Sequence, residues 1–220
     1  MTHARLMDAY FVVGMHRSGT SATMAVLHFL GVNIGYEWSP RNWGPFNEKG
    51  YFENPAFLAF EREVLKKANG SWNQIPEERH IYDIFPGMKP MLQKLVKWHS
   101  SEKWGYKGVR WSLFPETLTD IPNLHLIVTL RSPLAVAKSL KRRDGFEHSK
   151  SFELYSAYYY RIFKLLSRNP EIPFIIVNYD DLVEKTEATV KKIASFVGIE
   201  PTEKQINFFN DFIEKRLRHF

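Results

Sequence analysis

Residues 11–30 read FVVGMHRSGTSATMAVLHFL, and this stretch decides the fold. An apolar run ends at Gly14, a short polar loop follows, and a second apolar segment runs from Ala22 to Leu30 and stops at Gly31. The pattern predicts a strand, a glycine loop and a helix. Such a junction offers free backbone N–H groups and the positive end of a helix dipole, so it suits a phosphate-like anion.

The loop departs at one position from the loop that binds nucleoside triphosphates. Gly14, Gly19, Thr20 and Ser21 nearly match its spacing, but the lysine expected at position 20 is a threonine. The cation of this loop comes earlier, at Arg17. A P-loop kinase or NTPase with an altered phosphate loop is therefore the alternative interpretation. The absence of a clear strand-ending aspartate for magnesium also argues against it.

Size and composition indicate a globular chain. The 220 residues predict one domain, 1–220, with ample length for a core. No apolar run reaches membrane-spanning length and the first residues do not resemble a signal peptide, so we expect no transmembrane segment and a cytoplasmic location. The absence of cysteine excludes disulfides and thiolate catalysis.

The charge of the chain favours anionic ligands. The formal net charge is +6 at pH 7, which a basic solvated surface explains equally well because the cations are scattered. A non-catalytic nucleotide- or nucleic-acid-binding module is a third interpretation. Scattered charge and the lack of a known nucleic-acid motif argue against it, and we expect no nucleic-acid partner.

Short apolar runs alternate with helical patterns along the chain. We therefore expect an α/β, P-loop-like three-layer fold, with a central parallel sheet flanked by helices. Two segments, 33–52 and 70–90, are rich in loop-forming residues and predict long loops. The expected strands are 10–14, 104–106, 124–130 and 174–177.

Polar residues follow each expected strand. Arg17 lies in the first loop, Lys107 and Arg110 follow the second strand, Arg131 follows the third, and 178–181 follow the fourth. In open parallel sheets, ligands bind beyond the carboxyl ends of the strands. Cations at three of these four ends predict a site for a multiply charged anion.

Several of these segments resemble one family. The loop HRSGTS is similar to the 5′-phosphosulfate loop of sulfotransferases, and RSPLAVAKSL, with Ser139 eight residues after Arg131, resembles their 3′-phosphate segment. NYDDLV resembles a segment whose tyrosine, here Tyr179, lies near the adenine. NEKGYFEN and YKGVRWSLFPE look like segments of bacterial members. The resemblance extends in the expected order from residue 11 to about residue 197.

The resemblance implies 3′-phosphoadenosine 5′-phosphosulfate (PAPS) as the donor, with the 3′-phosphate held by Arg131 and Ser139. It also implies transfer without a metal, since the transferred group carries less negative charge than a phosphoryl group, and the eight histidines form no evident metal-ligand cluster. The expected 5′-phosphosulfate ligands are His16, Arg17, Ser18, Gly19, Thr20 and Ser21.

Catalysis by such an enzyme needs a cation at the leaving group and a general base. Arg17 occupies the place where many family members have lysine, and Lys107 is a second candidate. Glu53 is the favoured base, although an acid there equally well stabilises a helix N-terminus. Glu37, Glu48 and His16 are the other candidates for the base.

The sequence does not identify the acceptor, which is a small molecule, a glycan or a lipid with a hydroxyl or amine group. Lys141, Arg142 and Arg143 either complete the 3′-phosphate site or are exposed charges on a helix end. Four aromatic side chains can line an acceptor pocket, with ordinary loop packing as the alternative: Trp38, Trp43, Tyr51 and Phe52.

Overall fold

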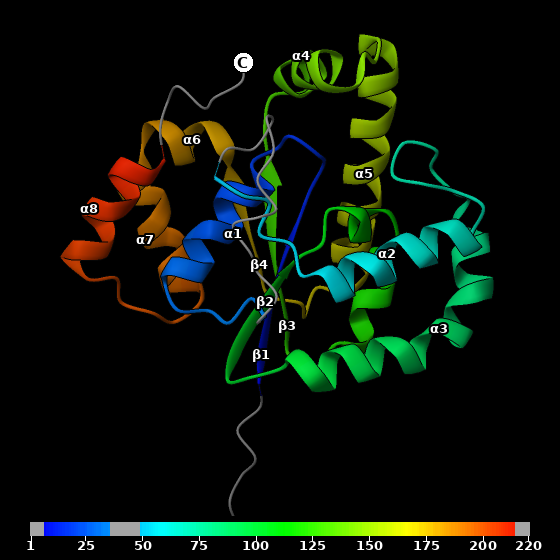
Figure 1. The fold of residues 1–220 in the computed structure, drawn as a ribbon, viewed down its shortest axis with the longest axis horizontal. Coiled ribbons are helices and arrows are strands. Elements are labelled where there is room, and N and C mark those ends of the chain that lie inside the picture. The colour runs from blue at the N-terminus through cyan, green and yellow to red at the C-terminus, as the bar shows by residue number, and fades with distance from the viewer. Residues whose placement is uncertain (1–6, 36–48, 214–220) are drawn as a thin grey trace, which may run out of the picture.

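The computed structural model describes residues 7–35 and 49–213, in which four strands form one parallel sheet. The strand order is β2-β1-β3-β4 (Figure 1). The strands are β1 (Asp8–Val13), β2 (Lys103–Lys107), β3 (Leu124–Leu130) and β4 (Phe174–Asn178). All four predicted strands are thereby confirmed, with ends displaced by no more than two residues.

Helices cover both faces of the sheet, which gives the expected three layers (Figure 1). One layer contains α1 (Thr20–Phe29), α6 (Tyr179–Glu184), α7 (Thr186–Phe196) and α8 (Glu203–Phe212). The other contains α2 (Pro55–Lys67), α3 (Glu78–His99), α4 (Pro133–Asp144) and α5 (His148–Arg168), with two short 3-10 turns, η2 (Arg110–Leu113) and η3 (Pro115–Asp120).

Strand β1 explains why both layers are needed. Its side chains alternate, so Phe11 and Val13 enter the hydrophobic cluster under α2, α3 and α5, while Tyr10 and Val12 enter the cluster under α1, α7 and α8. All four are buried. A strand that is apolar on both faces is stable only between two covering layers.

Local capping signals fix several helix ends as the sequence predicts. The Asn54 side chain accepts hydrogen bonds from Ala56 N and Phe57 N and so starts α2. The predicted capping box of Thr202 and Gln205 is present at the start of α8.

The predicted loop 70–90 is wrong over most of its length, because α3 begins at Glu78 and continues through Pro86 and Pro90. The helix buries Ile81, Met88, Leu92 and Leu95, which recur at helical spacing. Burial of this apolar face outweighs the backbone hydrogen bonds that the two prolines remove.

The predicted loop 33–52 is only partly described. Asn33 forms an isolated parallel bridge with Trp104 at the edge of the sheet, and residues 49–54 lead into α2 without regular structure. Segment 36–48 lies outside the described residues. Within the described ranges, the helices are all too short or too polar to span a bilayer.

Two glycines allow a matched test of how tightly the first loop packs against the start of α6. Gly19 (φ 95°) and Gly31 (φ 101°) share a left-handed backbone, but a Cβ at Gly19 would lie 2.3 Å from Tyr179 Cδ2, whereas nothing lies within 4 Å at Gly31. We expect Gly31→Ala to cost about 1 kcal/mol of unfolding free energy from backbone strain alone. Gly19→Ala should cost about 3 kcal/mol because overpacking is added.

Urea unfolding of both variants measures this difference. Equal losses for the two variants would show that Tyr179 does not pack on the loop.

Candidate active site

The carboxyl ends of the four strands meet at the upper edge of the sheet in Figure 1. Parallel pairing sets Val12 beside Lys107 and Val13 beside Val128, so the segments that follow these strands emerge side by side. The polar residues that the sequence placed after separate strands are therefore neighbours, as expected.

Buried hydroxyl groups anchor the first loop. Gly14 N donates to Ser112 Oγ at 2.9 Å, and Ser18 Oγ donates to Met15 O at 2.6 Å and lies 2.7 Å from Thr129 Oγ1. Ser18 N–H also bonds to Met15 O. Ser18 is fully buried and its side chain shapes the loop, so the structure does not bring this predicted ligand to the cavity described below.

The two predicted anion-binding segments are in direct contact. Arg17 Nε donates to Ser139 Oγ at 2.8 Å, across 122 residues of sequence. Arg131 NH1 donates to Arg17 O at 3.2 Å, and its guanidinium stacks 4.8 Å from the centre of the Tyr179 ring. Arg131 and Ser139 are both buried. The loop, the end of β3, α4 and the start of α6 thus form one cluster.

This cluster is crowded with positive charge. Burial, together with the nearby cations Arg143 and Arg131, lowers the pKa of Arg17 to about 10. Arg17 also adopts a left-handed backbone with φ 69°, which is strained for a residue with a side chain. Mutual repulsion of this kind is relieved when an anion binds between the cations.

The N-terminus of α1 adds to the same field. Gly19 occupies its cap position, and no side chain caps this end of α1. The backbone N–H groups of the first turn, which includes Thr20 and Ser21, have no partner within the helix. They point toward the end of the sheet where the arginines gather, and the helix dipole favours negative charge there.

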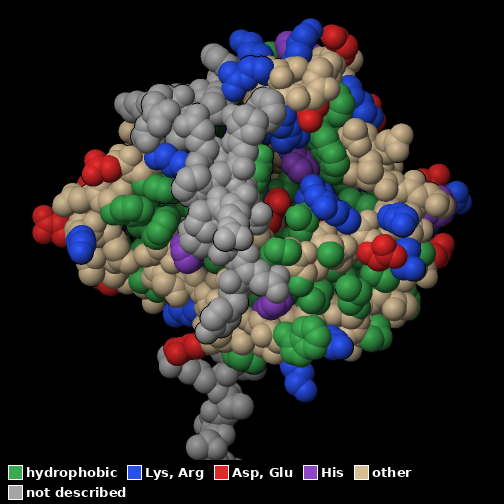
Figure 2. All heavy atoms as spheres, in the orientation of Figure 1, with side chains coloured by type: hydrophobic (Ala, Val, Ile, Leu, Met, Phe, Trp, Pro, Cys, Tyr) green, Lys and Arg blue, Asp and Glu red, His purple; other side chains and the backbone are tan. Residues whose placement is uncertain are grey.

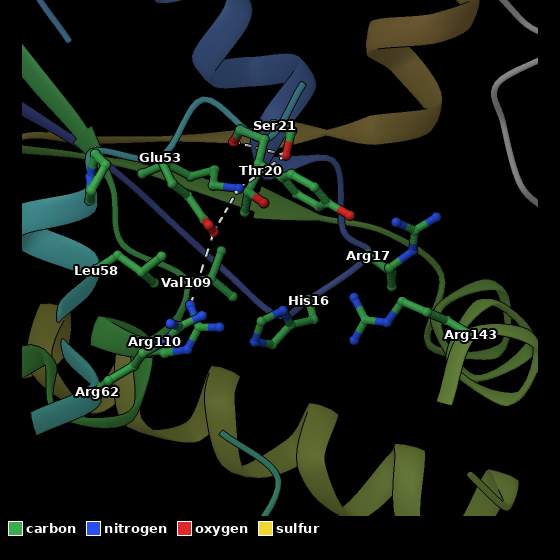
Figure 3. Close-up of a pocket in the computed structure, with 13 residues that line it drawn as sticks. His16, Arg17, Thr20, Ser21, Glu53, Leu58, Arg62, Val109, Arg110 and Arg143 are labelled. Carbon is green, nitrogen blue, oxygen red and sulfur yellow. Dashed lines mark hydrogen bonds and ion pairs between the residues drawn. The ribbon is translucent and has the colours of Figure 1, made fainter. Parts of the chain in front are cut away.

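Lys107, which is buried, and Glu53, which is partly exposed, form an ion pair beside this turn. Lys107 Nζ lies 3.0 Å from Glu53 Oε1 and donates to Ser21 Oγ at 3.1 Å (Figure 3). Burial alone would raise the pKa of Glu53, but Lys107 and Arg110 outweigh burial and hold it below its ordinary value. Burial lowers the pKa of Lys107, which Glu53 offsets only in part.

Glu61 is a second acidic residue of the site and is fully buried, and sequence reasoning missed it. It is 1% exposed and accepts hydrogen bonds from Tyr106 OH (3.1 Å) and Trp111 N (3.0 Å). Arg110 NH1 lies 3.7 Å from Glu61 and 4.0 Å from Glu53. Burial raises the pKa of Glu61 to about 7, although Arg110 opposes this rise. Glu61 therefore holds Arg110 in place from behind.

These groups surround a cavity of about 600 Å³. Figure 2 shows charged and histidine side chains gathered at a hollow near the middle of one face. In Figure 3, Arg62 and Arg110 lie on one side of the cavity, and Arg17 and Arg143 on the other. Its lining residues are His16, Arg17, Thr20, Ser21, Tyr51, Glu53, Pro55, Leu58, Arg62, Lys107, Val109, Arg110 and Arg143.

His16 lies between these two pairs of arginines (Figure 3). Its ring centre is 4.6 Å from that of Trp72, and its buried Nε2 has no hydrogen-bond partner among the described residues. Burial and the neighbouring cations Arg110 and Arg143 lower the pKa of His16 well below 6.5. At neutral pH the imidazole is therefore uncharged.

The remaining candidates separate into lining and packing residues. Tyr51 lines the cavity, whereas Phe52 is 3% exposed and packs in the hydrophobic cluster under α1. Arg143 lines the cavity and lies over the Trp72 ring, but Lys141 pairs with Glu147 at the surface. The predicted candidates Glu37, Trp38, Trp43 and Glu48 fall outside the described residues.

A family model for the sulfotransferase family matches residues 10–203. The chain belongs to the sulfotransferase family. No curated protein matches this sulfotransferase at the level of sequence.

Solved structures agree with the family in fold. The sulfotransferase domain of the curacin biosynthetic pathway has a TM-score of 0.53 at 16% identity, over 92% of this chain and 77% of that one. STF1 of Mycobacterium tuberculosis has a TM-score of 0.56 at 13% identity, over 94% of this chain and 71% of that one. Retinol dehydratase, solved with androsterone and the inactive cofactor PAP, has a TM-score of 0.52 at 17% identity, over 94% of this chain and 64% of that one. At these identities the likeness shows the α/β fold.

Sequence reasoning missed Glu61 and Arg62 because both lie inside the helix α2. One signal was present. Phe57, Phe60, Val64 and Leu65 form an apolar helical face, and Glu61 falls on it. A carboxylate on a buried face needs a cationic or hydrogen-bonding partner, so an acidic residue at this position indicates a polar site inside the fold.

Among the residues that the structure describes, no three histidine or acidic side chains are grouped to hold a metal ion. The cations that face the cavity of this sulfotransferase are its own arginine and lysine side chains.

The raised pKa of Glu61 has a consequence for stability. The pKa of Glu61 in the folded protein, about 7, exceeds its ordinary value of 4.5. The protonated side chain therefore contributes fully to the free energy of unfolding below pH 4.5, and this contribution is lost as the pH rises through about 7. Glu61→Gln does not titrate and can keep both hydrogen bonds. We expect the unfolding free energy of Glu61→Gln, relative to wild type, to rise by about 3 kcal/mol from acid to alkaline pH.

Urea unfolding at about pH 4 and about pH 8 measures this change. Glu63→Gln, on the same helix where Glu63 pairs with Lys67 at the surface, controls for loss of a carboxylate. If the difference in unfolding free energy between Glu61→Gln and wild type were the same at both pH values, Glu61 would not have a raised pKa.

Proposed function

We propose that this protein is a PAPS-dependent sulfotransferase that acts on a hydroxyl or amine acceptor. The observation that carries this proposal is the hydrogen bond from Arg17 to Ser139, which joins the first loop to α4. PAPS has two anionic groups on its ribose, one at the 3′ and one at the 5′ position, and a nucleoside triphosphate has no counterpart to the 3′-phosphate. Two joined cationic segments suit such a donor.

The donor residues would divide their work between the two anions. The first turn of α1, with Thr20, Ser21 and Arg17, would hold the 5′-phosphosulfate through N–H groups, hydroxyls and a guanidinium. Arg131 and Ser139 would hold the 3′-phosphate. The Tyr179 ring, already packed on Gly19 and Arg131, would lie beside the adenine.

In the reaction, the acceptor oxygen or nitrogen bonds to sulfur, the bond from sulfur to the 5′-phosphate oxygen breaks with its electron pair going to that oxygen, and the acceptor proton goes to a base. Lys107 and Arg17 border the cavity beside the loop and would stabilise the charge that develops on the phosphate. Fixed cations of this kind make a metal unnecessary for charge stabilisation.

Glu53 is the proposed base. It lines the cavity, is ionised at neutral pH and is fixed by Lys107 and Arg110. An anion that binds to Lys107 competes with this ion pair and thereby makes Glu53 more basic. His16 is the second candidate, because its uncharged ring faces the same cavity and Nε2 has no described partner.

Calorimetric titration tests the proposal through PAP, the product left after PAPS gives up its sulfuryl group. We expect tight, metal-independent binding of PAP and little binding of ATP with magnesium. Preferential binding of ATP would instead favour the kinase or NTPase interpretation.

Arg131→Ala extends this titration to the 3′-phosphate. We expect it to weaken PAP binding by about 10- to 100-fold, since a charge-assisted fork to phosphate is lost. Binding of AMP, which lacks the 3′-phosphate, should change little. A purely structural role, through the bond to Arg17 O, would weaken both nucleotides equally.

Glu53→Gln tests the base. We expect PAP affinity to stay within about twofold, while sulfuryl transfer from radiolabelled PAPS falls by about 100-fold or more because proton removal is lost. His16→Gln is the matched variant on the other side of the cavity. A larger loss of transfer in His16→Gln, with Glu53→Gln close to wild type, would assign the base to His16.

A further inference from the structure

The cavity contains more positive charge than the donor requires. Arg17 and Lys107 lie at the loop, and Arg131 with Ser139 lies beyond it, which accounts for both anions of the proposed donor. Arg62 and Arg110 lie together on the far side of the cavity, away from Arg17 (Figure 3). These two arginines need another explanation.

Arg110 is held there at a cost. Its side chain is 13% exposed, and its partner Glu61 is 1% exposed with both carboxylate oxygens engaged by Tyr106 and Trp111. Burial of such a pair is often unfavourable compared with apolar packing of the same volume. A buried network that fixes one arginine at a cavity wall is typical of a binding site.

Arg62 adds a second positive charge to this wall. It lies one residue after Glu61 on α2, is exposed and lines the cavity, and it makes no hydrogen bond or ion pair with any described residue. Glu53, the one carboxylate among the described lining residues, is already paired with Lys107 at 3.0 Å. The far wall therefore keeps a net positive charge.

The rest of that wall is apolar. Pro55 and Leu58, both on α2, and Val109 line the cavity with the two arginines. A ligand that fits this wall has a carbon skeleton and an anionic group within reach of the guanidinium groups. Arginine side chains bind carboxylate and phosphate oxygens through paired hydrogen bonds.

We propose that the acceptor is itself an anion, a hydroxyl compound with a carboxylate or phosphate group that Arg62 and Arg110 bind. This inference rests on the proposed function, since it takes the loop side of the cavity as the donor site. Arg110 already faces Glu61, but a neutral acceptor would cover Arg62 without compensating its charge, so the cavity selects against a neutral acceptor.

Matched acceptor analogues test the inference on the PAP-saturated protein, in which the donor site is filled. One arm compares glucuronate with glucuronamide, and the other compares glycerol phosphate with glycerol; ligand-observed NMR measures each affinity. We expect the charged member of at least one pair to bind about tenfold more tightly, the value of a charge-assisted contact. The arm that shows the preference identifies carboxylate or phosphate as the anion.

Arg62→Gln should abolish that preference while PAP affinity stays unchanged. Lys66→Gln removes the same charge one turn further along α2, outside the cavity, and should leave the preference intact. Equal affinities within both pairs, no binding of either anion, or a preference that survives in Arg62→Gln would each overturn the inference. Failure of PAP to bind in the first titration would instead overturn the proposed function.

Discussion

Parallel pairing of β1 with β2 on one side and β3 on the other is the constraint on which the site depends. Because all the strands point the same way, their carboxyl ends share one edge of the sheet. The register sets Lys107 level with Val12 and so brings it to the first turn of α1, where it reaches Ser21. If β2 ran antiparallel to β1, Lys107 at its carboxyl end would lie at the opposite edge of the sheet.

Placing so many cations at one edge costs stability, and the fold offsets this cost elsewhere. The backbone of Arg17 is strained and its pKa is lowered, and Arg110 is paired with the buried Glu61. Two hydrophobic clusters, one under each helical layer, provide the burial that lets the chain tolerate this. The mutual repulsion of these cations is also what would favour binding of the proposed anionic donor there.

Local sequence signals gave most of the fold correctly, since they depend on neighbours along the chain. The strand Leu124–Leu130, the cap at Asn54 and the capping box at Thr202 were all predictable in this way. The same reasoning failed for residues 78–90, where Pro86 and Pro90 indicated a loop. There, burial of a helical face against distant elements overrode the local preference of the two prolines, and the helical spacing of the buried apolar residues was the local signal that sequence reasoning passed over.

The sequence by itself determined that a glycine loop joins a strand to a helix, and that cations follow three strands. It also indicated which of these segments resemble sulfotransferases. Only the tertiary structure decided that Arg17 bonds to Ser139, that Lys107 pairs with Glu53, and that Glu61 holds Arg110. The physical reason is distance along the chain. Contacts between remote segments depend on strand order and helix packing, which one residue and its near neighbours do not specify.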